Sequence, residues 1–179
     1  SASIEIELDG AGTGGRPLRL LASGDVGPDA KLLQPDPRAP TGFDYVIAEA
    51  TYGDRIRAAT TPEQRRQLLA SEVRDAATAR GALLIPAFAV ERTQELIVDL
   101  FDLMERGEIP AAPIFLDSPL AIRATEVFRE HAESLDPDID VNRLFNSPHL
   151  RFTETVDESK AIAKLTGFHI VIAASGMCD

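Results

Sequence analysis

Serine, threonine and arginine side chains stand in three short stretches that each follow an apolar run. The stretches are AFAVERT, LDSPLA and AASGM, and they contain Arg92, Thr93, Ser118, Ser175 and Gly176. The carboxyl ends of parallel strands meet at one edge of a sheet, where ligands bind. Two of the stretches lead directly into a predicted helix, whose free N–H groups and dipole attract anions such as phosphate. Arg92 could add a bidentate clamp, so the sequence indicates an anion site at this edge.

Ser118 also has a simpler interpretation as the N-cap of a helix. It precedes Pro119, and proline is common at the first helical position after a serine cap. A cap can also lie beside a ligand, so both interpretations stay open. The coincidence of three such strand ends favours a functional role for the edge.

Two carboxylates follow apolar runs nearer the N-terminus. Asp25 lies in SGDVG and Glu49 lies in AEATYG, each at or just past the end of a predicted strand. A carboxylate at such a point either forms a turn or serves as a metal ligand or as the group that orients one. Spacing alone favours the turn.

Two other patterns are weaker. His131, His149 and His169 are too scattered to form a local pair of metal ligands, and His169 lies within an apolar strand. The stretch GAGTGG at residues 10–15 matches G-x-G-x-x-G, but a strand follows it instead of the helix that a dinucleotide site requires. We therefore favour a connection between strands over a nucleotide site.

The elements that must position these residues alternate between strands and helices. Strands are expected over residues 3–8, 18–24, 43–53, 82–88, 113–117, 150–154 and 168–174, and helices over residues 61–80, 90–107, 118–135 and 157–165. Strands that alternate with helices imply a parallel sheet with crossover connections.

Local patterns add detail to these elements. Thr61 and Gln64 form a capping box at a helix start, and Gly81 is expected to end that helix. Residues 3–8 alternate between polar and apolar types, which predicts a half-buried strand. Residues 82–88 are continuously apolar, which predicts a strand buried on both faces.

Composition narrows the class of protein. The chain has 179 residues, 44% of them hydrophobic, and a formal net charge of −11. This charge argues against a surface that coats nucleic acid generally, although a local basic cleft is compatible with it. Cys178 is the single cysteine, which excludes an internal disulfide and fits a reducing compartment. With no apolar run long enough for a bilayer and no secretory leader, we expect a cytoplasmic protein without membrane partners.

Six strings, taken in order, resemble the β-CASP branch of the metallo-β-lactamase superfamily. They are SGDVG, EATYGDR, GALLIPAFAVERTQEL, IPAAPIFLDSPLAIRATEVF, ESKAI and IVIAASGM. The resemblance is closest to RNA-processing nucleases, both relatives of the cleavage-and-polyadenylation endonuclease and bacterial RNA exonucleases. It implies an α/β fold in which a mainly parallel sheet flanked by helices forms the β-CASP cap, preceded by a few strands of an αββα metallo-β-lactamase domain. Residues 1–58 would belong to the latter and residues 59–179 to the cap.

The resemblance also assigns roles to individual residues. Asp25 matches the aspartate that bridges two zinc ions, and Glu49 matches the acidic residue that pairs with a later catalytic histidine. The H-x-H-x-D-H motif that supplies other zinc ligands in the family does not occur in these 179 residues. We therefore expect this chain to be the middle of a longer protein and not to hold zinc by itself. Ser175 and Gly176 would face the cleft that the RNA enters.

The resemblance implies a zinc-dependent ribonuclease that hydrolyses RNA and binds single-stranded RNA. It also allows a homodimer. The alternative is a catalytically silent module that binds RNA or protein. Three departures from the family pattern bear on activity and substrate preference. Ala50 replaces a usual serine, Arg57 stands where a histidine is common, and Glu91 replaces a usual glycine. The sequence does not decide whether the substrate is RNA or DNA, or whether the enzyme acts as an exonuclease or an endonuclease.

Overall fold

The structure is a computed structural model that describes residues 2–10, 12–27, 31–34, 40–56 and 60–174. The chain divides into two compact units. The N-terminal unit comprises residues 1–31 and 35–59, and the C-terminal unit comprises residues 32–34 and 60–179. Within the described ranges, no helix combines the length and the apolar character needed to cross a membrane.

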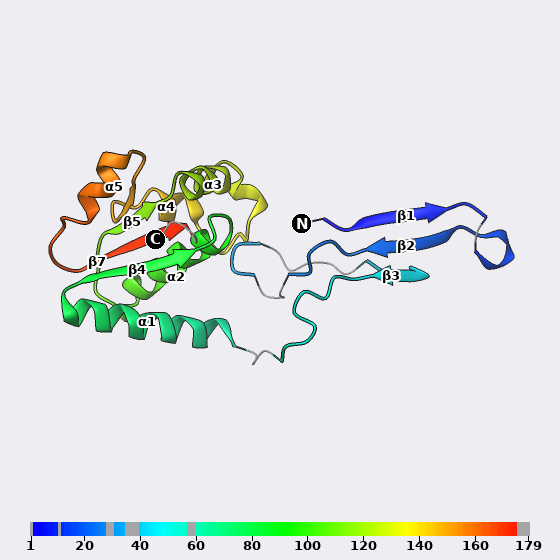
Figure 1. Cartoon of the computed structure of the whole chain (residues 1–179), viewed down its shortest axis with the longest axis horizontal. Helices are drawn as coiled ribbons and strands as arrows, with labels where there is room; N and C mark the ends of the chain where they lie inside the picture. The colour runs from blue at the N-terminus through cyan, green and yellow to red at the C-terminus, as the bar shows by residue number, and fades with distance from the viewer. Residues whose placement is uncertain (1, 11, 28–30, 35–39, 57–59, 175–179) are drawn as a thin grey trace. The chain divides into compact units, whose positions relative to one another are not determined.

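The N-terminal unit contains a three-stranded sheet (Figure 1). Its strands are β1 (Ile4–Leu8), β2 (Leu18–Ala22) and β3 (Tyr45–Ile47), in that order. β1 pairs with β2 in antiparallel fashion, and β2 pairs with β3 in parallel fashion. The glycine-rich stretch connects β1 to β2 and contains one short 3-10 turn at Thr13–Gly15.

The predicted half-burial of residues 3–8 is wrong. All residues of β1 and β3 are exposed, and Leu21 in β2 is the one buried side chain of the three described strands. An alternating strand buries its apolar side only when another layer packs on it. The described residues of this unit form no helix longer than a 3-10 turn and no second sheet, so no second layer within this unit covers either face of the sheet.

The C-terminal unit is built on a four-stranded sheet in which all strands are parallel. The strands are β4 (Ala82–Ala87), β5 (Ile114–Asp117), β6 (Leu150–Phe152) and β7 (His169–Ala174), and their order is β4-β7-β5-β6. The helices are α1 (Pro62–Ala79), α2 (Arg92–Glu105), α3 (Pro119–Glu130), α4 (Val141–Phe145) and α5 (Val156–Ile162), with a 3-10 turn at Ala132–Ser134. This arrangement confirms the predicted α/β fold (Figure 1).

The predicted burial of residues 82–88 on both faces is also wrong. β4 lies at an edge of the sheet, and its exposure alternates along the strand, with the Leu84 side chain 51% exposed. β7 has a similarly apolar sequence, and its residues from His169 to Ala173 are buried because β4 and β5 flank it. Pro86 is compatible with β4 because an edge strand tolerates the loss of a backbone donor.

Helix boundaries follow local capping. The Thr61–Gln64 capping box is present as predicted, but Arg80, not Gly81, adopts the left-handed conformation that ends α1, with φ 55°. α3 ends at Glu130 instead of residue 135, and its last predicted turn is the separate 3-10 turn. α4 was not predicted, because its sequence is short and follows a stretch rich in proline and aspartate.

The core of the C-terminal unit lies on one face of its sheet. The parallel register places alternate residues on this face, among them Ile114, Leu116, Ile170 and Ile172, all fully buried. They form one cluster with the apolar side of α2 and with residues of α1, α3 and α4. This packing fixes the strand ends from which the candidate site residues emerge.

Candidate functional site

The carboxyl ends of three strands meet at one edge of the C-terminal sheet. Ala87 pairs with Ala174 and Asp117 pairs with Ala173, so β4, β5 and β7 end side by side. The turn of residues 88–93 and the N-cap Ser118 follow directly from this edge. The sequence predicted this grouping. Ser175 and Gly176 lie outside the described residues, so their predicted place at the edge stays a prediction.

The turn between β4 and α2 is tight and strained. Glu91 has φ 69° and ψ −62°, and the backbone N–H of Arg92 donates to the carbonyl of Val90 over 2.9 Å. This is the geometry of a γ-turn with positive φ, which is rare for residues other than glycine. A glycine at position 91 would therefore relieve strain that Glu91 carries.

Thr93 closes the same turn from inside. Its backbone N–H and its hydroxyl both donate to the carbonyl of Phe88, over 3.2 and 2.8 Å. The residue is fully buried. Its observed contacts therefore shape the entry to α2, and its predicted contact with substrate stays a prediction.

Gln94 joins the first turns of α2 and α3 and was missed by the sequence analysis. Its Nε2 donates to the Ala89 carbonyl over 3.1 Å and to the Thr125 hydroxyl over 3.0 Å. The residue is fully buried, and its Oε1 has no hydrogen-bond partner among the residues that the structure describes. The available signal was a polar residue three positions before Ile97, on the apolar side of the helix.

Ser118 caps α3 as predicted. Its Oγ accepts a hydrogen bond from the backbone N–H of Ala121 over 3.3 Å, and the residue is fully buried. Pro119 has no N–H and the N–H of Ile122 donates to the Ser118 carbonyl over 2.9 Å, so an anion at this helix start would be attracted mainly by the helix dipole. The binding role of Ser118 stays a prediction.

Arg92 lies at the surface beside a buried carboxylate. Its Nη1 lies 2.7 Å from Oε2 of Glu95, and the Arg92 side chain is 49% exposed whereas the Glu95 side chain is 7% exposed. Glu95 also accepts from the backbone N–H of Leu32 over 3.4 Å. A phosphate that binds Arg92 must therefore share its guanidinium with Glu95. The guanidinium has five N–H donors, which is enough for both partners.

Glu49 lies just past β3 and is held by three hydrogen bonds. Its Oε2 accepts from the hydroxyl and the backbone N–H of Thr51, over 2.6 and 2.9 Å, and its Oε1 accepts from the backbone N–H of Val26 over 3.0 Å. The Thr51 hydroxyl bond, followed by the two backbone bonds, lowers the pKa of Glu49 to about 2. The carboxylate is therefore a fixed negative charge near neutral pH.

Asp25 follows β2, whose carboxyl end lies beside that of β3 because the two strands are parallel. The backbone N–H of Glu49 donates to the Ser23 hydroxyl over 3.0 Å, so the segments that carry the two carboxylates are tied together. Gly24 has φ 60°, and a Cβ there would lie 2.4 Å from the carbonyl oxygen of Ala2. Only glycine fits, which fixes the turn that presents Asp25 at the surface.

The described residues contain no group of three or more histidine, cysteine, aspartate or glutamate side chains that could hold a metal ion. A catalytic zinc site takes about three protein ligands plus water. Asp25 could supply one of them. The residues that the structure describes do not by themselves make a zinc site.

Comparison with known proteins adds a family assignment. Residues 93–179 match the model of the Beta-Casp domain. The chain is 35% identical over 164 residues to Ribonuclease TTHA0252 of Thermus thermophilus. The matched region covers 88% of this chain and 37% of that protein. It is 29% identical over 140 residues to an RNase J-like protein of Methanocaldococcus jannaschii, covering 78% and 31%.

A third relative is Cleavage and polyadenylation specificity factor subunit 3-II of Arabidopsis thaliana. It is 30% identical over 135 residues, covering 75% of this chain and 21% of the relative. The chain therefore spans well under half the length of the curated relatives that it matches.

Proposed function

Because the chain carries a β-CASP domain, we propose that it is the middle part of an RNA-processing nuclease that hydrolyses phosphodiester bonds. The observation that carries the proposal is the carboxyl edge of the parallel sheet, where the N-termini of α2 and α3 are joined by Gln94 and accompanied by Arg92. Such an edge suits phosphate groups. The names of two relatives, a ribonuclease and an RNase J-like protein, supply the substrate class.

In this proposal the C-terminal unit positions single-stranded RNA through its backbone. The Arg92 guanidinium binds phosphate oxygens, the dipoles of α2 and α3 favour the negative charge, and Ser118 and Thr93 hold the two helix starts in place. Ser175 and Gly176, which lie outside the described residues, are proposed to contact the RNA as well. Contacts to phosphate carry no sequence information, so this edge binds different RNA sequences alike.

The N-terminal unit contributes carboxylates. We propose that Asp25 supplies one ligand to a pair of zinc ions whose other ligands lie outside this chain, and that Glu49 orients a histidine. Bound zinc would activate water and neutralise charge that develops on the phosphate. Residues 1–58 would then be part of the catalytic domain and residues 59–179 part of the cap.

The proposal is tested in the complete protein that contains this chain. Asp25→Ala is expected to abolish RNA cleavage and to reduce zinc content, measured by gel assay and elemental analysis. Glu49→Gln is expected to lower the rate more than the zinc content, because its role is to orient a ligand. Asp9→Ala, at an exposed carboxylate outside the site, is the matched control and should change neither quantity.

Two outcomes would contradict the proposal. Cleavage that survives Asp25→Ala at the wild-type rate would remove the catalytic role of Asp25. Binding of RNA without any cleavage by the wild-type protein would show a silent binding module instead of an enzyme. The 179-residue chain alone is expected to retain no stoichiometric zinc after dialysis.

A further inference from the structure

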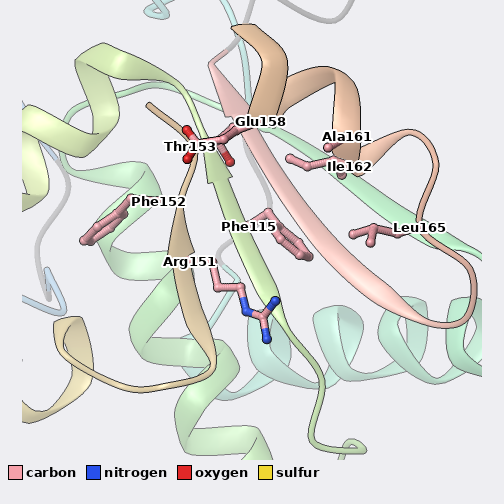
Figure 2. Close-up of a pocket in the computed structure, with 8 residues that line it drawn as sticks. All are labelled: Phe115, Arg151, Phe152, Thr153, Glu158, Ala161, Ile162 and Leu165. Carbon is pink, nitrogen blue, oxygen red and sulfur yellow. The ribbon is translucent and has the colours of Figure 1, made fainter. Parts of the chain in front are cut away.

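A hollow of about 260 Å³ lies between β5, β6 and α5, and its Glu158 end is near the carboxyl edge described above, because the neighbouring Ser159 hydroxyl donates to Asp117 over 2.8 Å. Its lining includes Phe115 and Arg151 from the strands and Thr153, Glu158, Ile162 and Leu165 around them (Figure 2). Phe115 pairs with Arg151 in the register, so both belong to the sheet face opposite Ile114 and Leu116. The hollow therefore lies on the other side of the sheet from the main core.

An aromatic ring forms the centre of the hollow. The Phe115 ring meets the ring of buried His169 edge to face, with 5.9 Å between centroids. The guanidinium carbon of Arg151 lies 5.7 Å from the centroid of the Phe115 ring. Figure 2 shows Arg151 and the residues of α5 on two sides of this ring. The ring is thus held in place by its neighbours and half-buried, which leaves part of it open to a ligand.

The charge of Arg151 is not neutralised by a carboxylate. The residue is exposed, and no ion pair joins it to another described residue, although the chain carries 29 acidic against 18 basic residues. Arg151 shares this with the exposed Arg123, whereas Arg143 pairs with Glu105 over 2.8 Å and Arg106 pairs with Asp102 over 2.9 Å. Arg151 therefore offers a positive charge at the rim of the hollow.

The opposite end of the hollow is negative. Oε2 of Glu158 accepts from the backbone N–H groups of Thr155 and Glu154, over 2.9 and 3.0 Å. These bonds, first that of Thr155, keep the pKa of Glu158 below its ordinary value, so the carboxylate is ionised near neutral pH. Figure 2 shows Glu158 and Arg151 at opposite ends of the hollow with Phe115 between them.

We propose that this hollow binds one unstacked nucleobase of a single-stranded RNA, with the base against Phe115 and its phosphate toward Arg151. Drug-sized ligands need pockets of roughly 300–1,000 Å³, so a hollow of about 260 Å³ suits a single planar ring system. Aromatic side chains bind single-stranded bases by stacking, and arginine binds phosphate. Ile162 and Leu165 cover the apolar side of the base, and N–H donors of the base face Glu158. The choice of RNA rests on the proposed function.

Methyl NMR of the 179-residue chain tests the site directly. Adenosine 5′-monophosphate is expected to shift the methyl signals of Ile162 and Leu165 in a saturable way, while those of Ile97 and Leu100 in the core on the other face stay in place. Ribose 5-phosphate, which lacks the base, is expected to bind at least about fivefold more weakly because it cannot stack. Equal affinity for the two compounds, or no shift at Ile162 and Leu165, overturns the proposal.

Two variants separate the contributions of ring and charge. Phe115→Leu keeps an apolar side chain and is expected to weaken nucleotide binding about fivefold or more. Arg151→Met is expected to weaken it roughly three- to tenfold by removing the phosphate partner. Arg123→Met, at another exposed arginine, is the matched control. Melting curves of all three show whether the fold is intact, and unchanged affinity in Arg151→Met contradicts the assigned phosphate contact.

Binding of single-stranded RNA to the same variants separates this inference from the proposed function. If Arg92→Ala weakens RNA binding and Phe115→Leu does not, the carboxyl edge binds RNA and the hollow does not, which overturns the inference alone. If the chain binds the nucleotide in the hollow but no RNA, the proposed function fails while the nucleotide site stands. Weakening by both substitutions supports both.

Discussion

The two units hold their candidate site residues by different means. In the C-terminal unit Thr93, Gln94 and Ser118 are fully buried, and a packed core of strand and helix residues surrounds them. In the N-terminal unit Glu49 is exposed, and hydrogen bonds from Thr51 and Val26 hold it. The positions of the first group depend on apolar burial, and the position of the second depends on a few polar contacts at strand ends.

The difference predicts that each candidate site responds to a different kind of substitution. A site inside a packed core changes when a distant core residue is removed, because the packing transmits the loss. A site held by local hydrogen bonds is sensitive to its own partners and tolerant of changes along the exposed strands. Substitutions in one unit should therefore leave the other site in place.

The largest expected effect comes from the core of the C-terminal unit. Ile172→Ala removes a fully buried side chain and is expected to lower the free energy of unfolding of this unit by about 2–5 kcal/mol. Ile47→Ala, at a side chain 64% exposed on β3, is expected to change the stability of the 179-residue chain by less than about 0.5 kcal/mol. Urea titration followed by circular dichroism measures both. A cost at Ile47 as large as that at Ile172 would show that β3 is buried in solution.

A smaller effect is expected in the ionisation of Glu49. Its folded pKa of about 2 lies below the ordinary value of 4.5, so its hydrogen bonds stabilise the folded state above about pH 4.5. That contribution is lost as the pH falls through about 2. Carboxyl ¹³C NMR should show Glu49 ionised at pH 3.5, and Thr51→Val should raise its pKa.

Thr60→Val, at an exposed threonine outside the site, serves as the control for this titration. It should leave the titration of Glu49 unchanged. An ordinary pKa for Glu49 in the wild-type chain would mean that the three hydrogen bonds do not persist in solution. Polar contacts would then not hold the candidate site of the N-terminal unit.

Much of the fold could be predicted because its signals are local. Strands alternating with helices imply a parallel sheet, and capping residues such as Thr61 mark helix starts. The order of strands within a sheet is not a local property, so the sequence could not distinguish the edge strand β4 from the central strand β7. The solvent exposure of β1 is likewise not a local property, because it depends on which layers pack against the strand.

The candidate site was predictable to a similar degree. Parallel strands place their carboxyl ends together, which predicts Arg92 and Ser118 at one edge. The pairing of Arg92 with Glu95 and the link through Gln94 depend on side-chain geometry between neighbouring helices, which residue types alone do not determine. The γ-turn at Glu91 was visible only as a departure from a family glycine.

We propose that the carboxyl edge of the C-terminal sheet binds the phosphate backbone of RNA, and this is a prediction about affinity. It is tested most directly by the affinity of the complete protein for single-stranded RNA as a function of salt concentration. Arg92→Ala should weaken binding of unrelated sequences equally and reduce the slope of log affinity against log salt by about 0.7, the loss of one phosphate contact. Arg92→Lys, which keeps the charge, should restore part of the affinity, and Arg123→Ala should have little effect. An unchanged salt slope in Arg92→Ala, or a loss confined to one RNA sequence, would contradict the claim.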